Sequence, residues 1–264
     1  MLVADIKLGI EIWNSLLRLK KKKSLYVISF LLKKGEIFMD LNIYIAVYPR
    51  TTKFAWGEVV DPVYDEKQIS LCPVCNGFLS GMKWIGEKTL EIRGRKNIPD
   101  FLYSYGTSNP FVISEKALNV LKDNGIKGIV DTEIIDKILV KKEPIDQKFY
   151  ILTLERCALP IDYTKSKIIF GKQLDPERIC KLCNPFGRTK DFIFGLYFDC
   201  NTKVDMDIFH TYEMGGTIFF SERFVEICQK NDLKGLFFEN VTEHYTGKGI
   251  LSEQEIEQMI KKFE

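Results

Sequence analysis

The sequence predicts an α+β protein, and three observations lead to this prediction. Residues 110–129, PFVISEKALNVLKDNGIKGI, align without a gap with residues 217–236, TIFFSERFVEICQKNDLKGL. Each segment runs from a short apolar strand through an amphipathic helix to a second apolar strand. Residues 42–48, NIYIAVY, alternate in the manner of a further strand. We therefore expect two pseudo-repeats of strand-helix-strand character.

The repeat extends beyond these two segments. The matched pairs are Ser114 with Ser221, Glu115 with Glu222, Asn124 with Asn231, Lys127-Gly128 with Lys234-Gly235, Asp100 with Asp207, and Tyr105 with Tyr212. The motif CPVC at residues 72–75 also corresponds to CKLC at 180–183, shifted by one more residue. Because agreement at so many positions is rare by chance, the chain is expected to hold two copies of one unit.

Each predicted helix has a start, a buried face and an end. Ser114 and Ser221 are suited to cap the helix N-termini, because a serine hydroxyl accepts from the free backbone N–H groups of the first turn. Gly125 suits the left-handed conformation that follows a helix. The expected buried stripes are Ala117, Leu118 and Leu121 in the first helix, and Phe224, Val225 and Cys228 in the second.

Residues 1–38 are expected to stand apart from the folded chain. Their run LYVISFLL lacks the small-residue cleavage site of a signal peptide, and a basic helix lying on a membrane surface has little support. Lys-Lys-Gly-Glu before Met39 can be encoded by a bacterial ribosome-binding sequence. We therefore interpret residues 1–38 as a translated leader or disordered extension, with Met39 as the true start. Residues 39–155 and 156–264 are then the two pseudo-repeats of one compact domain.

Composition narrows the class of protein. Apolar residues make up 45% and charged residues 28%, as in ordinary soluble domains, and no apolar run approaches the roughly 20 residues that a membrane-spanning helix needs. Residues 1–38 carry eight Lys or Arg and three Asp or Glu, so residues 39–264 hold a net charge of −3 against +2 for the whole chain. A mildly acidic body disfavours nucleic acid as a partner, because phosphate binding needs clustered basic residues.

The two CxxC pairs predict a metal site. Seven cysteines, an odd number, favour a reducing compartment, and a cytoplasmic location is expected. Structural zinc prefers four thiolates in a tetrahedral arrangement, and Cys72, Cys75, Cys180 and Cys183 can supply them. The gap of about a hundred residues is long for a zinc ribbon. A gap of this length is expected if a duplicated fold brings equivalent loops of the two copies together. We therefore expect one zinc-ribbon-like site that clamps the two copies.

Other interpretations of the cysteines stay open. A thioredoxin-like redox pair requires a helix that starts at the CxxC, and Asn76-Gly77 argues against one. Four buried thiols without a metal are the plainer alternative. Asn76 tolerates a left-handed turn after the first pair, whereas Pro185 pushes Asn184 toward an extended conformation. Cys157, Cys200 and Cys228 are expected as small core residues, His210 as a hydrogen-bonded packing residue, and His244 as exposed.

No catalytic motif is found in the sequence. It lacks a GxSxG elbow, an HExxH pair and a phosphate-binding glycine loop, and its two histidines offer little material for acid-base catalysis. Asp207 matches Asp100, which indicates a repeated structural role for this aspartate rather than a cation site with Asp205. A zinc held by four thiolates has no open position for water. The chain is therefore expected to be a binding protein and not an enzyme.

The assembled motifs resemble the double-CxxCG-motif family of bacterial immunity proteins. The segments that carry the resemblance are CPVCNGFLSGMKW, IPDFLY, NPFVISEKA, CKLCN, DMDIF and GGTIFFSERFVEICQKNDLKGLFF, which together span most of residues 40–240. The family's paired cysteines fall on Cys72, Cys75, Cys180 and Cys183. Asn76 and Asn184 stand where the family has glycine, which leaves the metal plausible and the loop geometry different.

The resemblance implies a function. Members of that family are encoded beside toxins used against competing bacteria and protect the cell by binding the toxin. We therefore expect a cytoplasmic immunity protein that neutralises a cognate toxin by noncatalytic binding. The net negative charge of residues 39–264 favours a basic toxin. The alternative is a zinc-ribbon-type module that binds nucleic acid or a regulatory partner.

Overall fold

A computed structural model describes residues 31–33, 36–38, 42–47, 54–94, 97–107, 111–173, 179–199, 201–244 and 253–261. The chain divides into two compact units, Met1–Asp40 and Leu41–Glu264. In the first unit, strands β1 (Leu31–Lys33) and β2 (Glu36–Phe38) form an antiparallel pair. Met39, Cys200 and most of the expected leader lie outside the described residues.

The second unit contains an eight-stranded sheet. Its strand order is β10-β13-β9-β8-β4-β7-β11-β12. The bounds of these strands are β4 Trp56–Val60, β7 Thr89–Arg93, β8 Phe101–Tyr105, β9 Phe111–Ser114, β10 Ile129–Ile134, β11 Lys137–Val140, β12 Glu143–Pro144 and β13 Phe149–Leu154. Most neighbours are antiparallel, but β4 with β8 and β7 with β11 run parallel.

A five-stranded sheet has the order β14-β17-β18-β3-β19. Its strands are β3 Ile43–Val47, β14 Arg156–Cys157, β17 Ile208–Thr211, β18 Ile218–Ser221 and β19 Phe237–Asn240. The expected strand at residues 42–48 is thus confirmed as β3, and its partners β18 and β19 come from the far end of the chain. Strands outnumber helices among the described residues, so the α+β protein is richer in β-structure than the sequence suggests.

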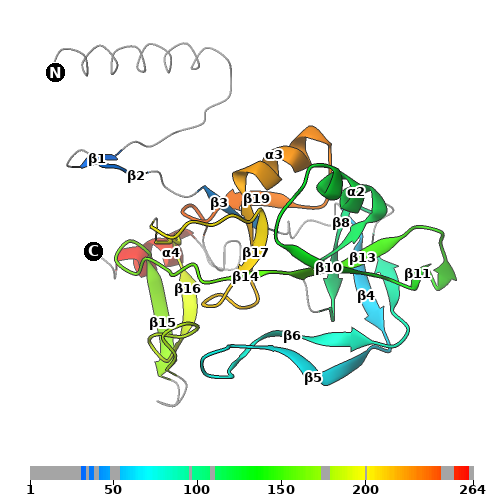
Figure 1. Ribbon diagram of the computed structural model, residues 1–264, viewed down its shortest axis with the longest axis horizontal. Coiled ribbons are helices and arrows are strands. Elements are labelled where there is room, and N and C mark those ends of the chain that lie inside the picture. The colour runs from blue at the N-terminus through cyan, green and yellow to red at the C-terminus, as the bar shows by residue number, and fades with distance from the viewer. Residues whose placement is uncertain are drawn as a thin grey trace, which may run out of the picture. The chain divides into compact units, whose positions relative to one another are not determined.

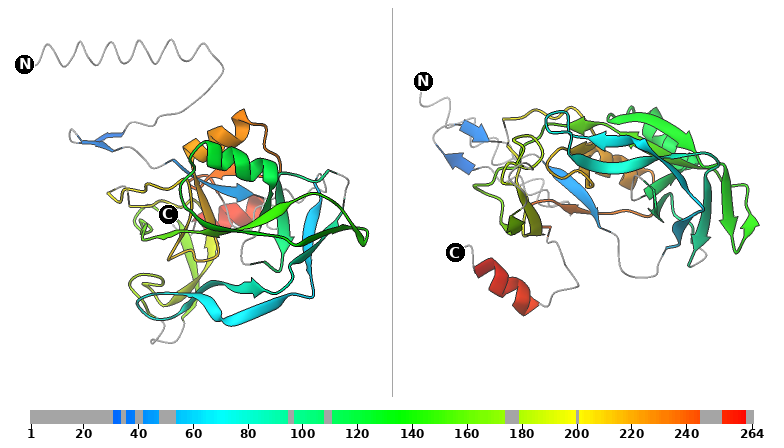
Figure 2. Two further views of the ribbon diagram at one scale, coloured as in Figure 1. Left: turned by 45° about the vertical axis from the view of Figure 1, so that its right-hand side comes forward. Right: turned by 90° about the horizontal axis from the view of Figure 1, so that it is seen from below.

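Helices α2 (Glu115–Asp123) and α3 (Glu222–Lys230) lie side by side in Figures 1 and 2. The hydroxyl of Ser114 accepts from the N–H of Ala117, and that of Ser221 from the N–H of Phe224, each at 3.1 Å. Both expected caps and both expected buried faces are confirmed, with Ile227 added to the second. Gly125 follows α2 with φ +60°, as expected. Helix α4 spans Glu253–Ile260.

The main core lies where the helices meet both sheets. Phe101, Phe111, Ile113 and Leu152 come from the larger sheet. Ile208, Ile218 and Phe220 come from the smaller one. Leu121 and Phe224 contribute from the helices and are fully buried. Burying side chains of this size supplies roughly 1.5–3 kcal/mol each, so this cluster is a principal source of stability.

Two long hairpins complete the unit. Strands β5 (Val63–Leu71) and β6 (Phe78–Ile85) form one, and β15 (Ile168–Gln173) and β16 (Arg188–Ile193) form the other. Each is a two-stranded antiparallel sheet with register shifts. The hairpins lie on the side of the unit away from α2 and α3 (Figure 1). No described helix is long and apolar enough to cross a bilayer.

Candidate metal centre

The connections at the ends of the two hairpins bring the predicted cysteines together. Cys72 and Cys75 lie between β5 and β6, and Cys180 and Cys183 lie between β15 and β16. The Sγ atoms of Cys72 and Cys180 are 3.8 Å apart, and those of Cys75 and Cys183 are 3.5 Å apart. All four sulfur atoms lie within 4.8 Å of one another.

Both cysteine turns are closed by backbone hydrogen bonds of the same kind. The N–H of Asn76 donates to the carbonyl oxygen of Cys72 at 2.9 Å, and the N–H of Asn184 donates to that of Cys180 at 2.8 Å. Asn76 adopts φ +55°, the left-handed conformation expected for it. In the second turn the left-handed residue is Gly187, with φ +58°, because Pro185 restricts Asn184. No helix starts at either CxxC pair, which disfavours a thioredoxin-like site.

The four thiols differ in exposure. Cys72 and Cys180 are buried, Cys183 is half-buried and Cys75 is exposed. Burial disfavours the thiolate of Cys180, but hydrogen bonds from the backbone N–H groups of Cys183 and Leu182 lower its pKa to about 7. Burial, followed by the neighbouring sulfurs, raises the pKa of Cys183. One sulfur can therefore carry negative charge easily, while another resists it unless a cation is close.

A tetrahedral zinc ion fits this donor set. Zinc–sulfur bonds of about 2.3 Å place the sulfurs of a regular tetrahedron about 3.8 Å apart. The Sγ–Sγ distances of 3.8 Å between Cys72 and Cys180 and of 3.5 Å between Cys75 and Cys183 are close to that separation. Soft thiolate donors select zinc over calcium or magnesium, which take oxygen ligands. The cluster is thus compatible with a structural metal site.

One basic side chain near the cluster was not anticipated from the sequence. Lys190 on β16 is half-buried and donates to the carbonyl oxygen of Glu213 at 3.2 Å. Burial lowers its pKa, whereas Glu213 and Cys183 act in the opposite direction. Lys190 therefore brings positive charge toward the sulfur atoms. Its role depends on a turn from another part of the chain, which no local pattern reveals.

The remaining expected site residues lie elsewhere. His210 is buried and hydrogen bonds to the carbonyl oxygen of Thr217, so the expectation of a packing histidine is confirmed. His244 is half-buried against Glu239 and is not exposed as expected. Asp205 forms an exposed ion pair with Lys127. Cys228 is buried in the core and Cys157 is partly buried.

Together, these features define a β-rich α+β protein in which two hairpins converge on a four-cysteine cluster. Residues 88–243 match the Immunity protein family (Imm11). The chain belongs to this family, which confirms the expectation of an immunity protein drawn from its motifs. The match includes the second CxxC pair and begins after the first. A comparison with curated proteins finds no match.

Proposed function

We propose that this chain is an immunity protein that neutralises a cognate bacterial toxin by direct, noncatalytic binding in the cytoplasm. Membership of the immunity family over residues 88–243 carries the proposal. The four-cysteine cluster supports a structural role for the metal, since four thiolates fill the coordination sphere of zinc and leave no position for water. Catalysis by that metal is therefore not part of the proposal.

Zinc held by Cys72, Cys75, Cys180 and Cys183 would supply a cross-link between the hairpins. The ion neutralises thiolate charge, while the backbone N–H groups of Leu182 and Cys183 orient toward Cys180. Because the pairs come from hairpins that are distant in sequence, the cross-link restricts a long loop. The proposed role is to fix the two hairpins relative to each other.

We also propose that residues 41–264 arose by internal duplication. The order β14-β17-β18-β3-β19 corresponds to the part β4-β8-β9-β13-β10 of the larger sheet. The outer pairs β4-β8 and β14-β17 are both parallel, and the other corresponding pairs are all antiparallel. In this scheme β3 and β13 are equivalent, and each completes the sheet of the other half. The second half then begins before β13, ahead of the expected boundary at residue 156.

Reciprocal contacts support the duplication. The N–H of Lys127 donates to Asp207 at 3.0 Å, and the N–H of Lys234 donates to Asp100 at 2.9 Å. Each aspartate also accepts from the capping serine of its own half, Ser221 or Ser114. The matched aspartates therefore have the same structural role in both halves.

The outer part of hairpin β5–β6 is our candidate for the toxin-binding surface. Its exposed large hydrophobic residues are Leu71, Val74, Phe78 and Met82, whereas Val63 and Ile85 are exposed at the base of the hairpin. Contiguous exposed apolar residues often mark a protein-binding surface. The exposed acidic residues Asp61, Glu66 and Glu87 outnumber the exposed basic residues Lys67 and Lys83 around the hairpin. The complementary partner is a toxin with an apolar patch bordered by basic residues.

Co-expression tests the function directly. The toxin encoded next to this gene is expressed in a sensitive cell with and without the full chain. The proposal expects growth to be restored and the two proteins to purify as a complex. A variant with an exposed substitution on α3, Glu226→Gln, serves as the folded control, because α3 lies away from the hairpins. If toxicity persists although the chain is folded and abundant, the immunity function is wrong for that toxin.

The alternative is a regulatory or nucleic-acid-binding zinc module. It rests on the cysteine cluster alone, whose closely placed sulfurs resemble the donor set of such modules. A gel shift with double-stranded DNA and with RNA at physiological salt tests it. Saturable binding to either nucleic acid would favour this alternative.

A further inference from the structure

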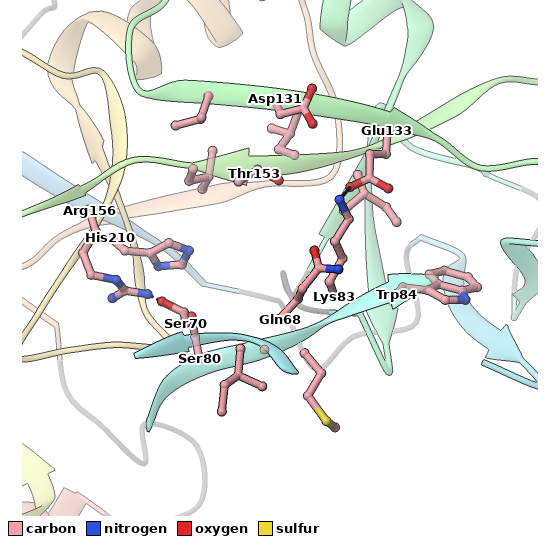
Figure 3. A pocket seen from close by; sticks show the side chains of 17 residues that line it. Gln68, Ser70, Ser80, Lys83, Trp84, Asp131, Glu133, Thr153, Arg156 and His210 are labelled. Carbon is pink, nitrogen blue, oxygen red and sulfur yellow. Dashed lines mark hydrogen bonds and ion pairs between the residues drawn. The ribbon is translucent and has the colours of Figure 1, made fainter. Parts of the chain in front are cut away.

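A cavity of about 550 Å³ lies between hairpin β5–β6 and strands β10 and β13. Figure 3 shows a group of polar side chains at each end, with Asp131 and Thr153 apart from both groups. Arg156, His210, Ser70 and Ser80 lie at one end, and Lys83 and Glu133 lie at the other. Lys83 and Lys88 both pair with Glu133, so the charge of this carboxylate is already compensated. The Arg156 end differs because it has a cation but no anion of its own.

Arg156 is held firmly in place. In the parallel strands β14 and β17, Arg156 and His210 lie directly opposite each other in the backbone register. Nη1 of Arg156 donates to the carbonyl oxygens of Thr211 at 2.6 Å and Gly215 at 3.1 Å, and its Nη2 donates to the hydroxyl of Ser80 at 2.8 Å. These bonds fix the guanidinium group and leave some of its five N–H groups for another acceptor.

The charge of Arg156 is not neutralised within the described part of the chain. Arg93 pairs with Glu58 and Glu91, and Arg223 pairs with Asp207, but no described carboxylate forms an ion pair with Arg156. Burial lowers the pKa of Arg156, which indicates the cost of removing its charge from water. The guanidinium carbon of Arg156 lies 6.0 Å from the centre of the Tyr212 ring, so a cation–π contact offsets part of this cost. Buried cations are usually compensated by an anion as well, so this end of the cavity is electrostatically incomplete.

His210 adds an unused acceptor. Its side chain is 5% exposed, and its Nδ1 lies 2.8 Å from the carbonyl oxygen of Thr217. A carbonyl can only accept, so Nδ1 carries the proton, and the neutral ring leaves a lone pair on Nε2. Within the described residues no group hydrogen bonds to Nε2. The ring lines the cavity next to Arg156 (Figure 3).

A purely structural role explains only part of this arrangement. The bonds of Arg156 to Ser80, Thr211 and Gly215 do tie hairpin β5–β6 to the segment around β17. A neutral side chain that donates hydrogen bonds could do the same without a desolvated charge. The structural role therefore does not account for the guanidinium charge or for the free Nε2 of His210.

We propose that this end of the cavity binds an oxyanion, a carboxylate or phosphate group. Arg156 neutralises the anion, and the hydroxyls of Ser70 and Ser80 hydrogen bond to its oxygens. Where the anion keeps an O–H, as hydrogen phosphate does and an ionised carboxylate does not, Nε2 of His210 accepts from it. The anion comes either from a free small molecule or from an acidic side chain of the toxin. The first source is independent of the proposed function, and the second rests on it.

The two histidines of the sequence permit a direct measurement. The full-length protein is titrated with inorganic phosphate near pH 7, at constant ionic strength set by sodium chloride, and the imidazole resonances are followed by NMR. Phosphate retains an O–H at this pH, so it can satisfy both Arg156 and His210. The expected result is a saturable shift of the His210 resonances, with His244 as the internal control.

Arg156→Gln should weaken phosphate binding about tenfold or more, because it removes the charge and the guanidinium fork. Arg188→Gln is the matched control, since Arg188 also donates to a backbone carbonyl, that of Gly171, and does not line the cavity. Ser80→Ala is a milder second variant in case Arg156→Gln fails to fold, with an expected loss of about threefold. Equal shifts of both histidines, or unchanged binding in these folded variants, would overturn the proposal.

A second experiment distinguishes the two sources of the anion, a free small molecule and an acidic side chain of the toxin. Phosphate is added to the complex of the chain with its toxin, and toxin affinity is measured for Arg156→Gln and Arg188→Gln. If the toxin supplies the anion, phosphate competes and only Arg156→Gln weakens the complex. If a free anion is the ligand, phosphate still binds the isolated chain. It then leaves the affinity for the toxin unchanged, and Arg156→Gln binds the toxin as tightly as Arg188→Gln does. If the chain binds phosphate but does not protect cells from the toxin, the anion-site proposal stands and the proposed immunity function is wrong.

Discussion

At the scale of single residues, Gly128 and Gly235 allow backbone segments that are far apart in the sequence to approach closely. Gly128 has φ +103°, and a Cβ there would lie 1.9 Å from the carbonyl oxygen of Ile208. Gly235 has φ +112°, and its Cβ would lie 2.1 Å from the carbonyl oxygen of Phe101. Both positions therefore exclude any side chain, for reasons of backbone conformation and of space.

We predict that Gly128→Ala and Gly235→Ala each lower the free energy of unfolding by about 3 kcal/mol or more, because strain and a backbone clash act together. Gly86→Ala is the control: Gly86 has φ +73° but open space around it, so only about 1 kcal/mol of strain is expected. Urea denaturation measures all three variants. Losses no larger than that of Gly86→Ala would contradict the close approach.

A second prediction concerns His210 and pH. Burial, and to a smaller extent the charge of Arg156, lowers the pKa of His210 to about 4 from 6.5. Between these values the unfolded chain binds a proton that the folded chain does not, so stability falls as the pH decreases from about 6.5 to about 4. The contribution of this residue is up to about 3 kcal/mol.

The measurement compares the wild-type chain with His210→Gln across this pH range in a phosphate-free buffer. The difference between their free energies of unfolding should change in favour of the variant as the pH falls, and level off below about pH 4. Other titrating groups cancel in this difference because both chains share them. A difference that does not vary with pH would show that His210 titrates normally.

At the scale of elements, the hairpins depend on their connections to the rest of the unit. A two-stranded hairpin is only marginally stable alone. Hairpin β5–β6 is held by the Arg156–Ser80 hydrogen bond and, with bound zinc, by the cysteine cluster. The core strands β9 and β18, one in each large sheet, depend far less on that cluster, because they lie in the main hydrophobic core.

We predict that Cys75→Ser lowers zinc content and increases amide hydrogen exchange in β5, β6, β15 and β16, while β9 and β18 stay protected. Cys228→Ser is the control, because Cys228 is buried in the core away from the cluster. It should lower overall stability while zinc content is retained. Metal analysis with hydrogen-exchange mass spectrometry distinguishes these patterns. Equal zinc content in both variants would argue against the four-thiolate site.

The same hairpin is expected to contact the toxin. Phe78 is 64% exposed, and we predict that Phe78→Asp weakens the toxin complex at least tenfold by placing a charge in an apolar contact. Ile134→Asp, at an exposed hydrophobic residue of β10, is the matched control and should change affinity little. Calorimetric titration with the purified toxin measures both. Similar losses in the two variants would place the contact elsewhere.

Sequence reasoning succeeded where structure depends on local chemistry. Ser114 and Ser221 cap helices, and Gly125 follows α2, because neighbouring residues determine those conformations. The repeat spacing also placed the four cysteines together. The cavity at Arg156 and His210 was missed because strands far apart in the sequence form it. The partners of β3 were missed for the same reason, since alternation identifies a strand but not its neighbours.

At the scale of the whole molecule, β3 pairs with strands from the C-terminal part of the chain and β13 pairs with strands that precede it, so the two parts of the chain depend on each other. A cut between Asp146 and Gln147 would separate β3 from β18 and β19, and β13 from β9 and β10. We predict that fragments 41–146 and 147–264 do not fold alone but form a stable complex when mixed. Circular dichroism and analytical size exclusion test this. Cooperative melting of either isolated fragment would contradict the interdependence.

The position of β3 has a consequence for synthesis on the ribosome. Asn42 beside β3 hydrogen bonds to Glu222, 180 residues later in the chain. At roughly 5–20 residues per second, translation needs roughly 10–35 seconds to cover that interval. During this time the nascent strand has an apolar edge without its final neighbours, which is a hazard for aggregation. A ribosome-bound chaperone is therefore expected to be most useful for this protein before its last quarter has emerged.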